Sequence, residues 1–248
     1  MELQRRHLTI SGIVQGVGFR PFVSNLAASL SLTGWVYNAG SQVEIEIEGP
    51  APQLDVFEEA LIKKAPPLCH IKNISSHKMH YIGYSGFIIK ESSSFSGGNI
   101  FIPADVSICS DCLKELMDKN DRRYLYPFIN CTNCGPRFTI INDVPYDRVN
   151  TTMNKFKMCS KCAHEYNDPL NRRYHAQPVS CYKCGPELTL TDNSGKRLNV
   201  SNPIIAVQKL LAEGNIIAIK GLGGYHLSCN ALNADTVRKL RQRKARDD

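Results

Sequence analysis

The chain has 248 residues, of which 42% are hydrophobic and 21% are charged, and its formal net charge is +7. This length allows one large domain or two to three small ones, and no apolar run of about eighteen residues is present, which excludes a membrane-spanning helix. The modest positive charge fits partners that carry phosphate, either small molecules or nucleic acid, and does not choose between them.

The N-terminal residues 1–6 are polar and lead directly into an apolar segment. They lack the hydrophobic core and the small-residue cleavage site of a signal peptide, so we expect a cytoplasmic protein. The cytoplasm keeps thiols reduced. The ten cysteines of the chain therefore predict metal ligation rather than a disulfide framework.

Residues 1–91 have the pattern of a compact α+β domain. The segment VEIEIE at 43–48 alternates strictly, which is typical of a half-buried strand. Apolar residues at helical spacing predict two amphipathic helices, the first with Pro21 in its opening turn. The expected strands cover 7–14, 35–38, 43–48, 71–79 and 87–90, and the expected helices cover 21–32 and 54–64. The two helices and the first four strands follow in the order βαββαβ, which is a ferredoxin-like split unit, and the strand at 87–90 comes after them.

The rest of the chain divides into four further pieces. A linker rich in Ser and Gly is expected at 92–103, followed by two cysteine-containing modules at 104–150 and 151–200 that show little regular periodicity. From residue 201 we expect a helix at 203–212, one buried strand at 216–219, a glycine-rich segment at 220–225 and a basic helix at 234–246. About fifty residues rarely form a stable core alone, so we expect this chain to be part of a longer protein.

Four CxxC pairs occupy the two modules, and they are duplicated. Eighteen residues separate the two pairs of each module, and each cysteine of the first module recurs fifty positions later. The flanking RRY and GP sequences recur with the same offset, which indicates an internal repeat. Two CxxC turns joined by a loop of about 15–20 residues are typical of a closed four-thiolate zinc site. The pattern predicts two structural Zn²⁺ ions, bound by Cys109, Cys112, Cys131 and Cys134, and by Cys159, Cys162, Cys181 and Cys184.

Two alternatives to this ligand assignment remain open. The eight thiols could be reduced and unligated, or the pairs could interleave, so that the first binds together with the third. The isolated Cys69 and Cys229 are interpreted as packing residues. His164 and His175 lie inside the second module, but four thiolates leave no need for them as ligands.

A glycine-containing loop at 15–20 joins the first strand to the first helix. Its two glycines allow a tight turn that exposes backbone N–H groups, and the helix N-terminus and an arginine add positive charge. The loop is therefore a candidate anion cradle, although a loop with two glycines taken alone would also fit a purely structural turn. The candidate phosphate-binding residues are Gln15, Gly16, Val17, Gly18, Phe19 and Arg20.

The run GIVQGVGFRPFV followed by GWVYNAGSQVEIEIEG closely resembles the signature of the acylphosphatase family. The resemblance implies that Arg20 binds phosphate and that Asn38 orients the attacking water. One departure is the Gly40-Ser41 pair in the turn where that family commonly has Asp-Gly, which bears on turn geometry. Hydrolysis of an acyl or carbamoyl phosphate breaks an activated anhydride, so positioning and electrostatic stabilisation suffice without a covalent nucleophile.

The order of the whole chain resembles the HypF family of hydrogenase maturation carbamoyltransferases. The resemblance rests on the acylphosphatase signature, on YPFINCTNCGPRFTI and HEYNDPLNRRYHAQP in the cysteine modules, and on KGLGGYHLSCNA near the C-terminus. It implies that carbamoyl phosphate is hydrolysed to carbamate, that a YrdC-like domain adenylates carbamate with ATP and Mg²⁺, and that the carbamoyl group passes to the C-terminal cysteine of the partner HypE. That cysteine then carries the precursor of the cyanide ligands of the nickel–iron centre.

The same resemblance implies nucleotide-binding roles for Lys220, Lys244 and Arg246, which otherwise read as a solvated basic surface. A zinc-ribbon protein that binds nucleic acid is the alternative from another class. The modules lack the interleaved aromatic and basic residues expected for binding single-stranded RNA, which disfavours it. A general acylphosphatase with accessory zinc modules is the nearer alternative. No membrane partner is expected.

Overall fold

The computed structural model describes residues 2–92 and 102–245. The chain divides into two compact units, residues 1–186 and residues 187–248, which are described separately. No helix within the described ranges is both long enough and apolar enough to cross a membrane. Most of the predicted linker, residues 93–101, and the predicted nucleotide-binding residue Arg246 lie outside the described residues.

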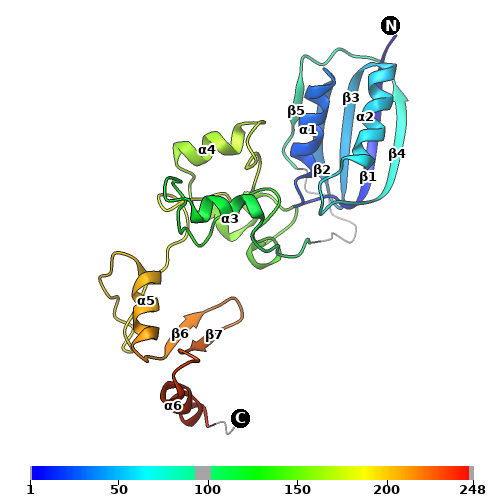
Figure 1. The fold of residues 1–248 in the computed structure, drawn as a ribbon. Coiled ribbons are helices and arrows are strands. Elements are labelled where there is room, and N and C mark those ends of the chain that lie inside the picture. Colours follow the sequence, from blue (N-terminus) through cyan, green and yellow to red (C-terminus); the bar gives the residue numbers. More distant parts are fainter. Residues whose placement is uncertain (1, 93–101, 246–248) are drawn as a thin grey trace. The chain divides into compact units, whose positions relative to one another are not determined.

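A five-stranded sheet begins the first unit (Figure 1). Its strands are β1 (Leu3–Ile13), β2 (Thr33–Ala39), β3 (Gln42–Pro50), β4 (His70–Met79) and β5 (Phe87–Ile89), in the order β4-β1-β3-β2-β5. Strand β1 pairs antiparallel with β3 and β4, and β2 pairs antiparallel with β3 and parallel with β5. The predicted ferredoxin-like α+β fold is confirmed, and its last two strands take opposite edges of the sheet.

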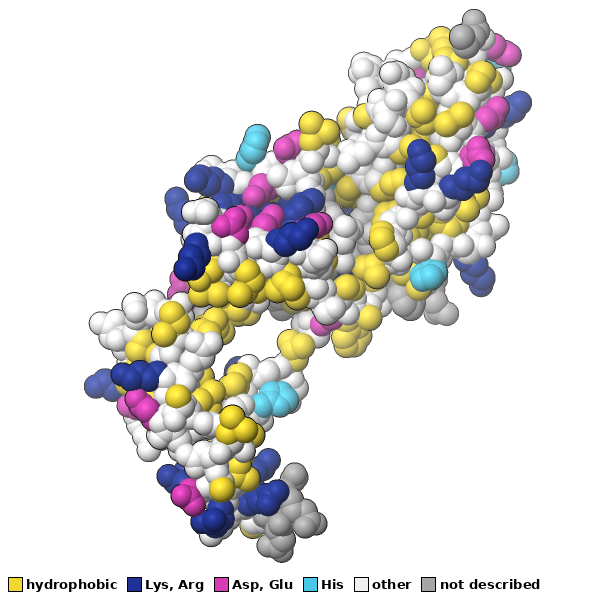
Figure 2. Space-filling model, viewed as in Figure 1, with side chains coloured by type: hydrophobic (Ala, Val, Ile, Leu, Met, Phe, Trp, Pro, Cys, Tyr) yellow, Lys and Arg dark blue, Asp and Glu magenta, His cyan; other side chains and the backbone are white. Residues whose placement is uncertain are grey.

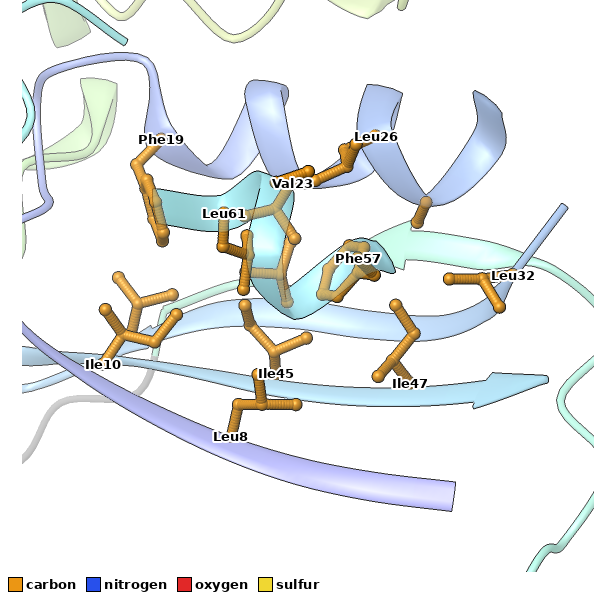
Figure 3. Close-up of a cluster of buried hydrophobic side chains, with 14 of the residues drawn as sticks. Leu8, Ile10, Phe19, Val23, Leu26, Leu32, Ile45, Ile47, Phe57 and Leu61 are labelled. Atoms are coloured by element: carbon orange, nitrogen blue, oxygen red, sulfur yellow. The ribbon is translucent and has the colours of Figure 1, made fainter. Parts of the chain in front are cut away.

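Helices α1 (Phe19–Ser29) and α2 (Ala51–Lys63) cover one face of this sheet (Figure 1). Alternate side chains of β1 and β3 point towards the helices, as period-two alternation requires. Leu8, Ile45 and Phe57 are fully buried between the two layers (Figure 3). Burial of each such side chain contributes about 1.5–3 kcal/mol to the stability of the fold. This core fixes the end of β1 and the start of α1, and so positions the loop between them.

Helix α1 differs from the prediction at both of its ends. It begins two residues earlier than residue 21 and ends three residues before residue 32. Ser31 adopts a left-handed φ of 53°, which a helix cannot continue through. Leu32 then turns into the core, at 3% exposure. Leu32, the last residue of the predicted helix, is therefore buried, but its backbone is not helical.

The two cysteine modules contain more regular structure than their sequence indicated. Short helices α3 (Ser110–Met117) and α4 (Ser160–Asn167) each begin directly after the first cysteine of a CxxC pair. In α3 the Sγ of Cys109 accepts the backbone N–H of Cys112 at 3.5 Å, so a thiol takes the place of the usual oxygen cap. Three short 3₁₀ turns, η1 (Phe138–Ile140), η2 (Arg148–Asn150) and η3 (Thr152–Lys155), lie in the connection between these helices.

The second unit contains α5 (Pro203–Ala212), β6 (Ile217–Lys220), β7 (Tyr225–Ser228) and α6 (Ala234–Lys244). The prediction of a single strand here was wrong, because β6 and β7 form an antiparallel hairpin. The glycine-rich segment between them reverses the chain, with the Gly221 N–H donating to the Gly224 carbonyl at 2.7 Å. Gly224 has a φ of 155°, which a residue with a side chain rarely adopts.

Candidate functional site

Two clusters of four cysteines lie in the first unit. Cys109, Cys112, Cys131 and Cys134 form one cluster and Cys159, Cys162, Cys181 and Cys184 form the other, with the four sulfur atoms of each cluster within 4.8 Å of one another. The structure thus groups the pairs within each module and does not interleave them.

The separations of the sulfur atoms can be compared with those of a zinc site. Adjacent sulfur atoms are 3.5–3.8 Å apart in the first cluster and 3.5–3.8 Å apart in the second. Four thiolates placed tetrahedrally at a Zn–S distance of about 2.3 Å would be about 3.8 Å apart. A disulfide would need about 2.05 Å. Both clusters are therefore consistent with zinc binding and fit a closed site without an open coordination position.

Each module also supplies arginines to the cluster of the other module. Arg122 donates to the Sγ of Cys162 at 3.3 Å, and Arg172 donates to the Sγ of Cys112 at 3.2 Å. Arg122 and Arg172 are fifty positions apart, and so are Cys112 and Cys162. The two contacts are therefore equivalent, and each module donates to a cysteine of the other. Arginine donors next to a four-thiolate site offset part of its negative charge.

Two glutamates accompany these arginines. Burial by itself would raise the pKa of Glu115, but hydrogen bonds from Arg172 and Arg173 outweigh that effect and hold the pKa at about 2. Glu165 takes the equivalent place opposite Arg122 and Arg123. Figure 2 shows basic and acidic side chains intermingled over the region of α3 and α4. The charges at this junction are thus mutually compensated.

Residues 15–18 of the predicted phosphate loop lie between β1 and α1, and its last two residues, Phe19 and Arg20, form the start of α1. Gly16 and Gly18 have φ values of 67° and 77°, so each occupies the left-handed region that favours glycine. Gly18 caps α1, whose first residue is Phe19. Gln15 is buried and donates from Nε2 to the Gly40 carbonyl at 2.8 Å, which ties the loop to the turn between β2 and β3. The loop therefore has the tight backbone and the helix N-terminus of an anion cradle.

Residues of both cysteine modules cover this loop. Arg137 is 2% exposed, and its Nε donates to the Gly16 carbonyl at 3.0 Å. A cavity of about 30 Å³ remains between the loop and the modules. Its lining includes Gln15, Gly16, Gly18, Phe19 and Arg20 from the loop and Thr132, Arg137, Tyr146, His175 and Gln177 from the modules. The candidate phosphate site is thus built by two parts of the chain that are far apart in sequence.

A second cavity of about 530 Å³ shares three of its lining residues, Arg20, His175 and Gln177, with the first. Arg20 donates from Nη1 to the Ser92 hydroxyl at 3.1 Å and from Nη2 to the Asp147 carboxylate at 2.6 Å. The arginine that the sequence singled out therefore stands in the wall between the two cavities, and residues outside the loop hold its guanidinium.

Asn38 lies on β2 and is fully buried. Neither polar atom of its side chain has a hydrogen-bond partner among the described residues. An amide that is buried without partners is rare, because each missing hydrogen bond costs about 1–3 kcal/mol. Asn38 is not among the residues that line the small cavity. It is two residues from Gly40, the turn residue to which Gln15 is bonded.

The remaining candidates lie apart from this site. Lys220 is the last residue of β6 and Lys244 is the last residue of α6, and both are exposed. Cys69 is half-buried beside the core of the first unit, and burial raises the pKa of its thiol to about 11, as befits a packing residue. Cys229 is also half-buried and belongs to neither cluster.

Sequence reasoning missed the module residues that face the loop. His175 and Gln177 stand where the first module has Leu125 and Pro127, fifty positions earlier. Leu125 and His175 share the same left-handed backbone, with φ values of 56° and 52°. Two places where the second copy departs from the first thus line the cavity. This departure is the signal that could have found them.

His175 is buried beside aromatic rings of its own module. Its ring lies 4.9 Å from Tyr166 and 4.6 Å from Tyr174, measured between centroids. Burial, together with the positive charge of Arg20, lowers the pKa of His175 to about 4. The imidazole is therefore neutral near pH 7, and it can donate or accept a hydrogen bond at the cavity without adding charge.

Comparison with known protein families gives matches along the chain. Residues 6–89 match the Acylphosphatase family, and residues 108–141 and 158–191 each match a family described as HypF finger. Residues 209–248 match a family described as Telomere recombination. The acylphosphatase match contains the glycine loop, and each HypF finger match contains one cluster of four cysteines.

Individual relatives cover nearly the whole chain. Carbamoyltransferase HypF2 of Cupriavidus necator is 50% identical over 246 residues, which are 98% of this chain and 30% of that protein. Probable carbamoyltransferase HypF of Methanocaldococcus jannaschii is 52% identical over 241 residues, which are 96% of this chain and 32% of that protein. A solved structure of full-length HypF in the phosphate- and nucleotide-bound form has a TM-score of 0.88 at 46% identity, over 99% of this chain and 32% of that one. The chain thus spans about a third of the length of the curated relatives that it matches.

Proposed function

The chain belongs to the HypF family of carbamoyltransferases, and from this premise we propose that its N-terminal domain hydrolyses carbamoyl phosphate as the first step of carbamoyl transfer. The observation that carries this proposal is the position of Arg20, in the wall of a cavity that also exposes the loop of Gly16 and Gly18. A phosphoryl group seated there meets backbone N–H groups, a helix N-terminus and a fixed cation together.

The chemistry asks little of the protein. A carbamoyl phosphate is a mixed anhydride, so its bond to phosphate is already activated. Holding the phosphoryl oxygens and orienting one water towards the electrophilic centre supply most of the acceleration. Arg20 and the loop residues Gln15, Gly16, Val17, Gly18 and Phe19 would hold the phosphoryl group. The side-chain amide of Asn38 would orient the water, which would give its buried polar atoms the hydrogen-bond partners that they lack among the described residues.

The two clusters would each hold one structural Zn²⁺ through their eight cysteines. A zinc ion in a closed four-thiolate site cross-links two CxxC turns and supplies folding energy, and it has no open position for substrate. In this chain the modules that such ions would stabilise also cover the phosphate loop, because Arg137 bonds to Gly16. The zinc sites would therefore support catalysis by shaping the cavity.

The later steps would involve the C-terminal piece of this chain. We place the domains at 1–91, 104–150, 151–200 and 201–248, with a linker at 92–103, and assign the last piece to a YrdC-like domain. There Lys220, Lys244 and Arg246 would contribute to binding ATP with Mg²⁺, which activates carbamate as an adenylate. The carbamoyl group would then pass to HypE in the cytoplasm.

The proposal is tested by measuring phosphate release from carbamoyl phosphate by the 248-residue chain. Arg20→Ala should raise KM by at least about tenfold, because phosphate is bound in both the ground state and the transition state. Asn38→Ala should act on kcat, by about 10²–10³, because the water is oriented only for attack. Lys63→Ala removes an exposed helix lysine that pairs with Glu59, and it should leave both constants unchanged. Absence of hydrolysis in the folded, zinc-loaded chain would exclude the hydrolytic role of this domain.

A general acylphosphatase is the second candidate, favoured by the match of residues 6–89 to that family. The same assay with acetyl phosphate separates the two. A kcat/KM for carbamoyl phosphate well above that for acetyl phosphate supports a dedicated carbamoyl phosphatase, and equal values support the general activity.

A further inference from the structure

The guanidinium of Arg20 is held by residues that do not belong to the phosphate loop. Its Nη2 bonds to the Asp147 carboxylate at 2.6 Å and its Nη1 bonds to the Ser92 hydroxyl at 3.1 Å. The Ser92 hydroxyl in turn donates to the second oxygen of Asp147. The side chains of Arg20 and Asp147 are 10% and 21% exposed, so solvent screens this pair only in part. Asp147 lies 127 positions after Arg20, near the end of the first cysteine module.

The backbone around Asp147 is anchored on both sides. Before it, the Tyr146 hydroxyl donates to the Pro136 carbonyl of the first module at 2.9 Å. After it, the Arg148 guanidinium donates to the carbonyls of Gln177 at 2.6 Å and Val179 at 3.0 Å in the second module. Contacts with both modules therefore fix the position of the Asp147 carboxylate.

The carboxylate approaches Arg20 from the side away from the phosphate loop. Asp147 lines the larger cavity, whereas the small cavity that contains Gly16 and Gly18 does not include it. Asp147 thus does not occupy the place of a phosphoryl group in the loop. A guanidinium has five N–H donors, and the contacts to Asp147 and Ser92 use two of them. Three donors remain for an anion at the loop.

We propose that Asp147 is a positioning residue of the phosphate site, which holds Arg20 in the orientation that binds the phosphoryl group of the substrate. The inference rests on the proposed acyl phosphate hydrolysis and assigns to the first cysteine module a part in that site. An arginine side chain has several rotatable bonds, and fixing it beforehand lowers the entropy lost when the anion binds. The four-cysteine modules thereby complete the acylphosphatase domain.

The test uses the 248-residue chain and compares Asp147→Ala, Asp147→Asn and Arg20→Ala with the unchanged protein. Asp147→Ala should raise KM for carbamoyl phosphate by about tenfold, the ratio that one lost charge-assisted hydrogen bond corresponds to, with a smaller change in kcat. Asp147→Asn keeps an oxygen that can accept from Nη2, and its KM should lie between those of Asp147→Ala and the unchanged protein. Asp118→Ala removes an exposed carboxylate of the same module and should leave KM unchanged.

A double substitution separates positioning from general damage. If Asp147 acts through Arg20, Asp147→Ala should add almost nothing to the effect of Arg20→Ala, because the two residues form one unit. An additive effect on KM, or a KM that falls when Asp147 is removed, would overturn the inference, since a fall would mean that the carboxylate competes with the substrate. Should Asp147→Ala fail to fold, as judged by zinc content and circular dichroism, Ser92→Ala tests the other contact and should raise KM about threefold; an unchanged KM would then count against the proposal.

The role of Asp147 can also be tested independently of the proposed hydrolysis. If the unchanged chain releases no phosphate, hydrolysis is excluded, and binding of inorganic phosphate measured by calorimetry replaces KM. Weaker binding in both Asp147→Ala and Arg20→Ala would then support the positioning role without catalysis. Full phosphate binding by Asp147→Ala beside weakened binding by Arg20→Ala would refute it.

Discussion

Arg172 donates two hydrogen bonds, each of 3.2 Å, to the Sγ of Cys112, which belongs to the other cysteine module. The reverse contact exists between Arg122 and Cys162 at 3.3 Å. Four thiolates around one Zn²⁺ carry a net charge of about −2, and N–H donors to sulfur reduce the free-energy cost of gathering them. Each module thus completes the surroundings of the other module's metal site, which a single module could not do alone.

The two clusters predict the metal content. Purified chain should contain about two zinc ions, as measured by elemental analysis. Cys131→Ser should lower the content to about one or less, because three thiolates bind zinc weakly and a structural ion supplies much of the folding energy of its module. Folded protein with a zinc content near zero would contradict the prediction.

The exchange of arginines predicts how fast zinc is lost. Arg172→Ala should speed zinc transfer from the first cluster to a chelating dye by about 10-fold to 100-fold, the range found for groups that support metal ligands. Arg172→Lys should restore only part of the effect, because an ammonium cannot make the same paired contact. Lys114→Ala on α3 serves as a control, since Lys114 is exposed and has no contact with sulfur among the described residues. Equal rates in all four proteins would show that the arginines do not support the metal.

The close packing of Gly16 against the first cysteine module predicts that a side chain at this position lowers the stability of the protein. An added Cβ would lie 2.6 Å from Cγ of Pro103 and 3.3 Å from Tyr146, in a backbone with a φ of 67°. Gly83 has a similar φ of 83°, but its added Cβ would meet nothing closer than 3.8 Å. Gly16→Ala should therefore lower the free energy of unfolding by about 1–3 kcal/mol more than Gly83→Ala, measured by urea denaturation. Equal losses would show that only backbone strain matters at Gly16.

His175 predicts a dependence of stability on pH. Its pKa in the folded protein is about 4, below the usual value of 6.5, because of burial and of Arg20. The folded state therefore binds this proton more weakly than the unfolded state. The corresponding stability is fully present above about pH 6.5 and is lost as the pH falls towards 4.

His175→Asn isolates this contribution, because asparagine does not titrate and tolerates the left-handed backbone of this position. Urea unfolding at pH 7, 6 and 5 should show a steeper fall for the unchanged protein than for the variant. Protonation of the cysteines affects both proteins alike and cancels in the comparison. Parallel curves over this range would contradict the low pKa.

The sequence by itself determined the pieces whose signals are local. The alternation of 43–48 and the helical spacing of the first ninety residues predicted the ferredoxin-like domain, because period-two and period-3.6 patterns state directly which face is buried. The fifty-residue repeat placed four thiols in each module, and the structure groups them so. The sequence of the glycine loop also singled out Arg20 and the glycines beside it. A loop that must expose its N–H groups needs residues that can take positive φ.

Only the tertiary structure decided what surrounds Arg20. Asp147, His175 and Gln177 reach the phosphate loop from segments more than a hundred residues away, and no local pattern marks a contact across that separation. The exchange of arginines between the modules was hidden for the same reason, since a repeat shows that two units are alike but not that each completes the other. The hairpin of β6 and β7 was missed because the glycines that turn the chain also resemble an open loop. In each case the packing of segments determined the contact, and the conformational preferences of neighbouring residues did not specify it.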